Sequence, residues 1–190
     1  NQSNTDLGSS VASAGDVNGD GYSDVIVGAR HYSNGQRYEG AFFVYHGSAN
    51  GISSTATAHV EGNQANAQMG SSVASAGDVN GDGYSDVIVG APYYDNGDED
   101  EGVAYVYLGS ASGIGTTAIA QVESDQFSAL MGYSVASAGD VNGDGYSDII
   151  VGTSHYTNGQ LYEGTAFVYH GNAGGGLRRN LVAFNTGTTT

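Results

Sequence analysis

Short runs of apolar residues recur along the chain, and clusters of Gly, Asn, Asp and Ser separate them. The first two runs are Ser9–Ala14, which alternates small and apolar side chains, and Asp24–Ala29, which is rich in β-branched residues. An aromatic and β-branched run follows at Ala41–Tyr45, and a more polar run lies at Thr55–Val60. Runs of this length predict β-strands, and the second suits a strand that is buried on both faces. No part of the sequence has a sustained helical period.

The same four runs occur three times, because the chain is one unit repeated with small changes. The segment GSSVASAGDVNGDGYSDVIVGA at Gly8–Ala29 returns unchanged at Gly70–Ala91 and with three substitutions at Gly132–Thr153. Repeats of this length indicate an array of similar supersecondary units. The fourth strand of the last copy is expected at Leu181–Phe184. The predicted units are residues 1–62, 63–124 and 125–190.

Four strands in each unit are typical of the blades of a β-propeller. We therefore predict an all-β fold of three four-stranded antiparallel blades. A β-solenoid is the structural alternative, but its coils are usually much shorter than these units. Propellers usually close with about four to eight blades, so three blades would leave an apolar flank exposed at each end. We expect two chains related by a two-fold axis to complete a six-bladed ring, and the alternative is a piece of a longer, six- or seven-bladed protein.

Composition adds a strong negative charge to this picture. The 190 residues include 20 Asp and Glu, four Arg and no Lys, which gives a formal net charge of −16. Such a chain repels phosphate backbones and anionic lipid, so nucleic acids and membrane surfaces are poor partners. There is no cysteine, which excludes disulfides and thiolate metal sites. No apolar run has the length of a bilayer span, and the polar start of the chain is not a signal peptide.

Each unit has an acidic loop of the form D-x-N-x-D-G-x-x-D between its first two strands. Ca²⁺ takes about six to eight oxygen ligands, and side chains at positions 1, 3 and 5 converge on one point when the chain coils tightly. Gly21 suits the sharp turn, because glycine adopts a positive φ without a Cβ clash. The backbone carbonyl of position 7 and the carboxylate of position 9 would complete the ligand shell. The predicted ligands of the three Ca²⁺ ions are Asp16, Asn18, Asp20, Tyr22 and Asp24; Asp78, Asn80, Asp82, Tyr84 and Asp86; and Asp140, Asn142, Asp144, Tyr146 and Asp148.

Two observations favour a metal site over an ordinary turn rich in Asp and Asn. Such residues are common in turns, but here every oxygen-bearing position recurs in all three copies. Three carboxylates within a few Å also repel one another unless a cation joins them. An EF-hand shares the first half of this spacing, but it needs a bidentate glutamate at position 12, where this chain has Val27, Val89 and Val151. The sequence therefore excludes an EF-hand and the related dockerin loop.

The order of these motifs carries a family resemblance. An acidic loop between a GSSVAS run and a VIVGAP run, followed by GVAYVY, resembles the FG-GAP repeats of integrin α-subunit propellers and of their bacterial relatives. The resemblance covers essentially the whole chain, although Leu7, Met69 and Met131 stand where the family often has Phe, and only Gly90–Pro92 spells the full Gly-Ala-Pro signature. It implies a structural calcium ion in each loop and a partner-binding surface on the opposite face of the propeller.

The connections expected on that opposite face differ most between the copies. These connections either vary freely in solvent or form a ligand surface lined by Tyr32, Tyr94 and Tyr156, and the tyrosines could equally pack between blades. The second copy alone has an acidic run at Asp95–Glu101, which is either a solvated charge run or a further cation site. One glutamate position is common to all copies and indicates a shared structural hydrogen bond rather than catalysis: Glu39, Glu101 and Glu163.

No arrangement of residues for catalysis is found in the sequence. Four of the five histidines are replaced in another copy, as Leu108 replaces His46 and His170, which argues against a catalytic base or a zinc ligand. There is also no nucleophile–base pair, phosphate-binding loop or HExxH helix. We predict an extracellular, non-catalytic, calcium-stabilised scaffold for adhesion or for recognition of a protein or glycan. The alternatives are a lectin, an accessory domain of a secreted hydrolase, and a designed or minimal self-assembling propeller without a ligand.

Overall fold

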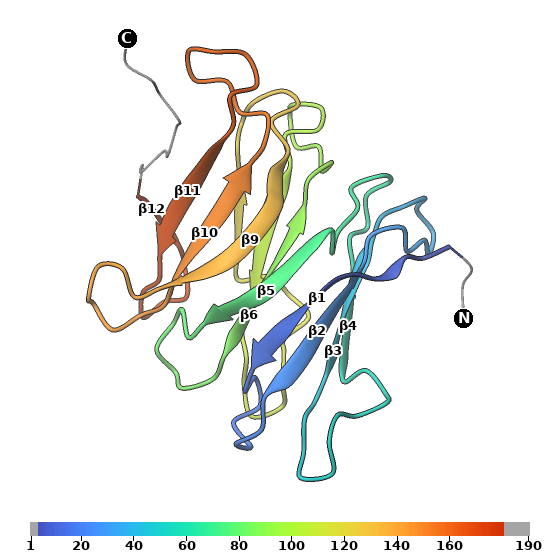
Figure 1. The fold of residues 1–190 in the computed structure, drawn as a ribbon, viewed down its shortest axis with the longest axis vertical. Coiled ribbons are helices and arrows are strands. Elements are labelled where there is room, and N and C mark those ends of the chain that lie inside the picture. Colours follow the sequence, from blue (N-terminus) through green and yellow to red (C-terminus); the bar gives the residue numbers. More distant parts are fainter. Residues whose placement is uncertain (1–3, 181–190) are drawn as a thin grey trace.

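The computed structural model describes residues 4–180, which form three four-stranded antiparallel sheets and no helix (Figure 1). Blade 1 consists of β1 (Leu7–Gly15), β2 (Asp24–Ala29), β3 (Ala41–Tyr45) and β4 (Ala58–Glu61). Blade 2 consists of β5 (Ser72–Gly77), β6 (Asp86–Ala91), β7 (Val103–Tyr107) and β8 (Ala120–Glu123). Blade 3 consists of β9 (Met131–Gly139), β10 (Asp148–Thr153), β11 (Thr165–His170) and β12 (Arg178–Asn180). The strands of each blade follow one another in chain order, so the predicted three all-β sheets are confirmed.

The second strand of each blade is the most deeply buried of the four, and it pairs with a neighbour on both sides, as the third strand also does. Val27 on β2, for example, lies opposite Val11 of β1 and Phe43 of β3. All six residues of β6 are buried, whereas β2 and β10 alternate between buried and half-buried positions. The difference arises because blade 2 has a blade on each side, while blades 1 and 3 each have only one among the described residues. In the same part of the chain, no helical segment has the length and hydropathy needed to cross a membrane.

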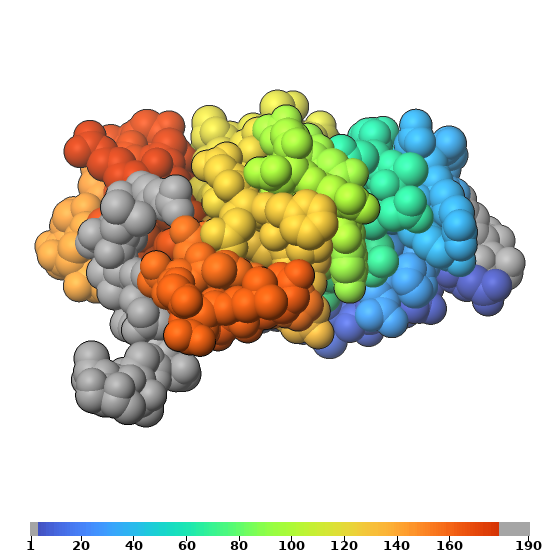
Figure 2. Space-filling view, turned by 90° about the horizontal axis from the view of Figure 1, so that it is seen from above, coloured from blue at the N-terminus to red at the C-terminus, as the bar shows by residue number. Residues whose placement is uncertain are grey.

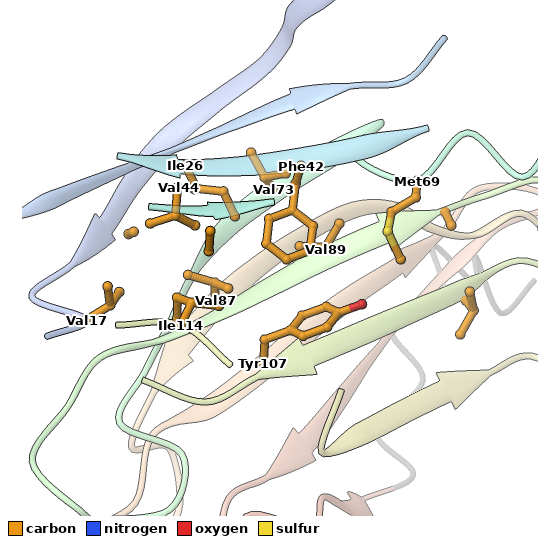
Figure 3. Packing of buried hydrophobic residues seen from close by; sticks show 14 residues of the cluster. Val17, Ile26, Phe42, Val44, Met69, Val73, Val87, Val89, Tyr107 and Ile114 are labelled. Carbon is orange, nitrogen blue, oxygen red and sulfur yellow. The ribbon is translucent and has the colours of Figure 1, made fainter. Parts of the chain in front are cut away.

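Neighbouring blades pack face to face in a row, with their first strands side by side (Figures 1 and 2). The core between blades 1 and 2 contains Phe42 and Tyr107, whose ring centroids are 4.9 Å apart (Figure 3). The other large side chains of this core are Val17, Ile26, Val44, Met69, Val73, Val87, Val89, Val103 and Ile114. The equivalent core between blades 2 and 3 contains Val79, Ile88, Val106, Met131, Ile149, Val151, Phe167 and Tyr169.

Glycine allows the blades to approach closely at their inner strands. A Cβ atom on Gly28 would overlap the carbonyl oxygen of Gly70 in the next blade, and the hydroxyl of Ser10 donates a hydrogen bond to this same oxygen at 2.7 Å. The second junction repeats the arrangement, with Gly90 and Ser72 against the carbonyl of Gly132, again at 2.7 Å from the hydroxyl. The two junctions between blades are therefore built from the same parts.

The fourth strand differs from its predicted position. In blade 1 it begins at Ala58 rather than Thr55, because the amide and hydroxyl of Thr57 both donate to the carbonyl of Val44 before regular pairing starts. In blade 3 it is β12, which pairs with Val168–His170. The strand predicted at Leu181–Phe184 lies outside the described residues.

Candidate metal centre

The acidic loop connects the first two strands of every blade, as predicted, and its first aspartate organises the turn. Asp16 Oδ1 accepts hydrogen bonds from the amides of Gly19 and Asp20, at 2.7 and 3.1 Å, and Oδ2 accepts one from Gly21 at 2.8 Å. Gly21 has a φ of 88°, which glycine adopts without strain. The equivalent bonds of Asp78 and Asp140 measure 2.6–3.1 Å. The backbone thus coils around position 1 in all three loops.

The side chains of positions 3 and 5 lie together inside this coil. Asn18 Nδ2 donates to Asp20 Oδ2 at 3.0 Å, and Asn18 Oδ1 accepts from the amide of Asp20 at 3.0 Å. Asp20 Oδ1 in turn accepts from the amide of Tyr22 at 3.0 Å. Asp16, Asn18 and Asp20 are therefore brought together as the prediction requires. Their half-buried or exposed positions leave oxygen lone pairs open to an ion from solvent.

The aspartate of position 9 makes buried hydrogen bonds that the sequence did not predict. Asp24 is 1% exposed, and its two carboxylate oxygens accept hydrogen bonds from the amides of Val17 and Gly47, at 2.9 and 2.8 Å. It therefore ties the acidic loop to the connection between β3 and β4. Asp86 and Asp148 make the same pair of bonds, at 2.8–3.1 Å. Each oxygen keeps a second lone pair, so these bonds are compatible with a bound ion.

The charges in the loops are consistent with a cation. Asp86 is fully buried, and burial raises the pKa of its carboxyl to about 7, with a further contribution from Asp82 and Asp78, although amide hydrogen bonds act in the opposite direction. A buried carboxylate beside like charges is stabilised by a cation. The hard oxygen donors and the tight coil fit Ca²⁺. An ion held by them would supply an electrostatic cross-link between the exposed loop and the buried strand.

The raised pKa of Asp86 predicts how stability depends on pH in the absence of metal. Between pH of about 4 and about 7 the folded state retains a proton that the unfolded state has lost. The free energy of unfolding in a chelator should therefore decrease as the pH rises through this window. Urea denaturation at several pH values measures the slope. Asp86→Asn, which does not titrate, should have a shallower slope, and equal slopes in the two proteins would contradict the assignment.

The loops of blades 1 and 2 are also held by the blade that follows each of them. Ser85 and Ser110 of blade 2 donate their amides to the carbonyls of Asp16 and Val17, at 2.9 and 3.0 Å. The Tyr84 ring covers Gly19 so closely that a Cβ on this glycine would lie 2.7 Å from the ring. The second junction has the same contacts, from Ser147, Asn172 and Tyr146 of blade 3 to Asp78, Val79 and Gly81 of blade 2.

The glutamate that all copies share lies just before the third strand of each blade, at the end of the sheet away from the acidic loop. Glu39 is buried and accepts the amide of Asn34, while Asn34 Nδ2 donates to Glu61 at 3.0 Å. In blade 2, Glu101 accepts the amide of Asn96 at 2.6 Å, and Asn96 Nδ2 donates to Glu123 at 2.8 Å. The predicted structural hydrogen bond is confirmed in these two blades.

A second acidic cluster lies beside this network in blade 2. Only Glu101 of the acidic run takes part, and its carboxylate, with those of Glu123 and Asp125, offers oxygens within 4.8 Å of one another. Burial raises the pKa of Glu101, and the charge of Glu123 adds to the effect. In blade 1 the same hydrogen-bond network exists with Asn63 in place of the third acid. The hydrogen bonds of Glu101 and Glu123 are therefore common to blades 1 and 2, and the carboxylate of Asp125 is what blade 2 adds to them.

The three tyrosines on this side contact the third strand of their own blade, and Tyr94 and Tyr156 also pack against the cores between blades. Tyr32 lies edge-on to Phe43, with ring centroids 5.9 Å apart. The equivalent pairs are Tyr94 with Tyr105 at 6.0 Å and Tyr156 with Phe167 at 5.3 Å. These contacts brace the connection between the second and third strands against the third strand.

Comparison with known proteins agrees with this architecture. The family model of the FG-GAP repeat matches residues 7–45, 69–107 and 131–169, which together are more than half of the chain and hold the first three strands and the acidic loop of each blade. Similar proteins include integrin alpha-4 of Xenopus laevis, 34% identical over 150 residues and 77% of the chain, and integrin alpha-V of Gallus gallus, 34% identical over 165 residues and 82% of the chain. Integrin alpha-6 of Homo sapiens is 32% identical over 139 residues and 73% of the chain.

These matches involve only a small part of each integrin subunit. The aligned region spans 14% of integrin alpha-4, 16% of integrin alpha-V and 12% of integrin alpha-6. The repeats and the blades nevertheless correspond one to one, since each matched segment lies within one blade and holds its first three strands and its acidic loop. The chain belongs to the FG-GAP repeat family and has the propeller blades of the integrin α type.

Proposed function

We propose that this chain is a non-catalytic binding scaffold in which one Ca²⁺ ion locks the acidic loop of each blade. The observation that carries the proposal is the repeated loop geometry, in which the backbone coils around the first aspartate, the side chains of positions 3 and 5 are hydrogen-bonded to each other, and a buried aspartate follows at position 9. A site that forms only in the folded blade converts metal binding into folding free energy. Calcium is therefore structural in this proposal, and the scaffold rather than the metal presents the binding surface.

An extracellular location follows from the same proposal. Extracellular calcium modules bind the ion with dissociation constants of about 10⁻⁴–10⁻³ M, which suit the calcium level outside cells. Such weak sites would stay empty in the cytosol, and the chain would then carry its net charge of −16 uncompensated. We place the protein outside the cell or at its surface.

The ligand surface in this proposal is the face opposite the acidic loops. All three blades contribute there to a hollow of about 220 Å³, which is lined by Arg30, Gln68, Ser71, Pro92, Tyr93 and Tyr133. Arg30 lies 3.4 Å from Asp6, and both side chains are partly exposed. An exposed guanidinium beside tyrosine rings offers an acidic group of a ligand both a charge partner and an apolar contact. Connections at the ends of a rigid scaffold are common places for recognition.

Calorimetric titration with CaCl₂ after chelator removal tests the metal part of the proposal. We expect three ions per chain, and two ions for Asp16→Ala, because that variant loses the side chain around which loop 1 coils. Asp98→Ala, a change in the exposed acidic run of blade 2, serves as the control and should still bind three ions. A titration without binding heat or calcium uptake would contradict the proposal, and so would loss of one ion in the control.

A further inference from the structure

The acidic loops of blades 1 and 2, called loop 1 and loop 2 below, have identical predicted ligands but a different residue beside them. His46 and Leu108 occupy the same position, directly after the third strand of each blade. The next residue is Gly47 or Gly109, whose amide binds the buried aspartate of its own loop. Both side chains are half-buried and pack against the blade that follows, so the comparison depends only on described residues.

The ring of His46 is held in place by the following blade. A Cβ atom on Gly113 of blade 2 would lie 2.7 Å from Nε2 of this ring, and a Cβ on Gly175 of blade 3 would lie 3.5 Å from Leu108 Cδ1. Nε2 is buried and has no hydrogen-bond partner among the described residues. A buried polar atom without a partner costs free energy, and the leucine of blade 2 avoids this cost. Packing alone therefore does not account for a histidine at this position.

The other ring nitrogen of His46 contacts a predicted calcium ligand. Nδ1 lies 3.3 Å from Nδ2 of Asn18, and Asn18 Oδ1 accepts the amide of Asp20 at 3.0 Å. The second contact assigns the oxygen of the Asn18 side chain, so its amino group faces the ring. Nδ1 is then the acceptor, and the ring proton is on Nε2. Both hydrogens of the amino group have an acceptor, since Asp20 Oδ2 lies 3.0 Å from the same nitrogen.

The orientation of this amide decides whether Asn18 can bind a cation. Only Oδ1 offers lone pairs to an ion, and a rotation of the amide by half a turn would present the amino group instead. The hydrogen bond to His46 favours the first orientation. An ion on Oδ1 polarises the amide and strengthens the bond from its amino group, so this contact stabilises the ion-bound loop more than the empty one.

The asparagine of loop 2 has a leucine in the place of this acceptor. Asn80 Nδ2 donates to Asp82 Oδ2 at 2.8 Å, and the side chain of Leu108 cannot accept its second hydrogen. The bond to Asp82 engages a carboxylate that the ion also needs. In loop 1 one N–H can stay on His46 when the carboxylate of Asp20 turns to the ion, whereas in loop 2 the amino group must turn to water.

The third copy has a histidine again, but its ring contacts a different residue. His170 Nδ1 lies 3.1 Å from Asp148 Oδ2, the carboxylate of position 9. Blade 3 has no following blade among the described residues, so the comparison is confined to loops 1 and 2.

We propose that His46 is a positioning residue for the calcium site of loop 1 and makes this site tighter than that of loop 2. It does not touch the ion, but it holds the Asn18 amide with its oxygen toward the ion. Loss of the outer partner of a metal ligand typically costs about 10- to 100-fold in affinity, and we expect the dissociation constants of the two loops to differ by this factor. The loops would then fill one after the other as calcium rises. This inference rests on the proposed function, because it concerns two of the three calcium loops.

Calcium titration of the intact chain, followed by NMR, measures each loop separately. The amides of Gly21 and Gly83 are matched reporters, because each donates to the first aspartate of its own loop at 2.8 Å. The Gly21 signal should shift at a calcium concentration about 10- to 100-fold lower than the Gly83 signal. Equal midpoints, or an earlier shift of Gly83, would refute the inference.

Exchange of residues between the two copies tests the role of the ring. His46→Leu gives loop 1 the residue of loop 2 and should raise the Gly21 midpoint to that of Gly83, without a change at Gly83. Leu108→His should lower the Gly83 midpoint. His46→Asn keeps an acceptor near the place of Nδ1 and should retain most of the affinity of loop 1. A role in packing alone predicts the opposite order, with leucine tolerated better than asparagine.

A measurement without calcium tests the geometry itself, and the outcomes separate this inference from the proposed function. In EGTA, the nitrogen spectrum of His46 should show the neutral ring with its proton on Nε2, and a proton on Nδ1 refutes the inference. Absence of calcium-dependent shifts at both glycines refutes the proposed function, and this inference with it. Shifts at both glycines that His46→Leu leaves unchanged refute only the inference.

Discussion

Chelation of calcium is expected to lower the melting temperature of this protein by about 15–30 °C. At a calcium concentration about a hundredfold above the dissociation constant, each site adds about 2.7 kcal/mol to the free energy of unfolding, so three sites add about 8 kcal/mol. An ordinary domain has only about 5–15 kcal/mol in total. One kcal/mol shifts the melting temperature of a chain of this size by about 2–4 °C. Thermal melts followed by circular dichroism, in calcium and in EGTA, measure the difference.

Two controls separate a bound ion from general screening of charge. Sodium chloride at matched ionic strength screens repulsion between exposed carboxylates but does not replace a divalent ion in a site of oxygen ligands, so it should restore little of the lost stability. Magnesium should also restore little, because it prefers a smaller octahedral shell and retains its water ligands. Full recovery in sodium chloride would show that screening, and not site binding, stabilises the blades.

Asp86→Ala is expected to have a larger effect than substitution of an exposed aspartate in the same acidic loop. The side chain is fully buried, and its removal leaves the amides of Val79 and Gly109 without their acceptors. Each buried amide without a partner costs about 1–3 kcal/mol, in addition to the loss of the ion at that loop. Urea denaturation in calcium should therefore give a loss of about 2–6 kcal/mol beyond the contribution of the ion.

Asp82→Ala is the matched control for this prediction. Asp82 belongs to the same loop but is exposed, and its amide partner, Tyr84, can bond to water when the carboxylate is removed. This variant should lose only the contribution of the ion, about 2.7 kcal/mol at a hundredfold excess of calcium. Equal losses in the two variants would show that the buried hydrogen bonds of Asp86 contribute nothing beyond metal binding.

Much of the fold was predictable because each local signal occurs three times. The apolar runs placed β2 at Asp24–Ala29 and β3 at Ala41–Tyr45 without error. Repetition also favoured a metal site over an ordinary turn, since a turn does not require the same oxygen atoms in every copy, and this part stays a prediction. The fourth strand was placed less well, because it is polar and its beginning depends on the bonds that Thr57 makes to Val44 across the blade.

The remaining features depend on contacts that sequence spacing does not encode. The burial of Asp24 arises from amides seven and 23 residues away, which come together only when the blade folds. Its place at the start of a strand that is buried on both faces was the available signal. The tyrosine contacts were uncertain for a similar reason, since the partner of Tyr32 could be identified only once the connection folded back on Phe43. The exposure of Val11 in blade 1 and of Val141 in blade 3 likewise depends on the position of the blade in the row. The equivalent valines of the neighbouring blades have nearly the same sequence around them but are buried.

Because every unit carries both halves of the junction, the number of units is not determined by the sequence of any one of them. Gly28 and Ser10 on one side, and the carbonyl of Gly70 on the other, recur with the repeat. A gene that gained or lost one copy by unequal recombination would still encode blades whose faces match. The architecture can therefore change its size in single genetic steps without compensating mutations, and ring geometry, rather than surface chemistry, would select which copy numbers persist.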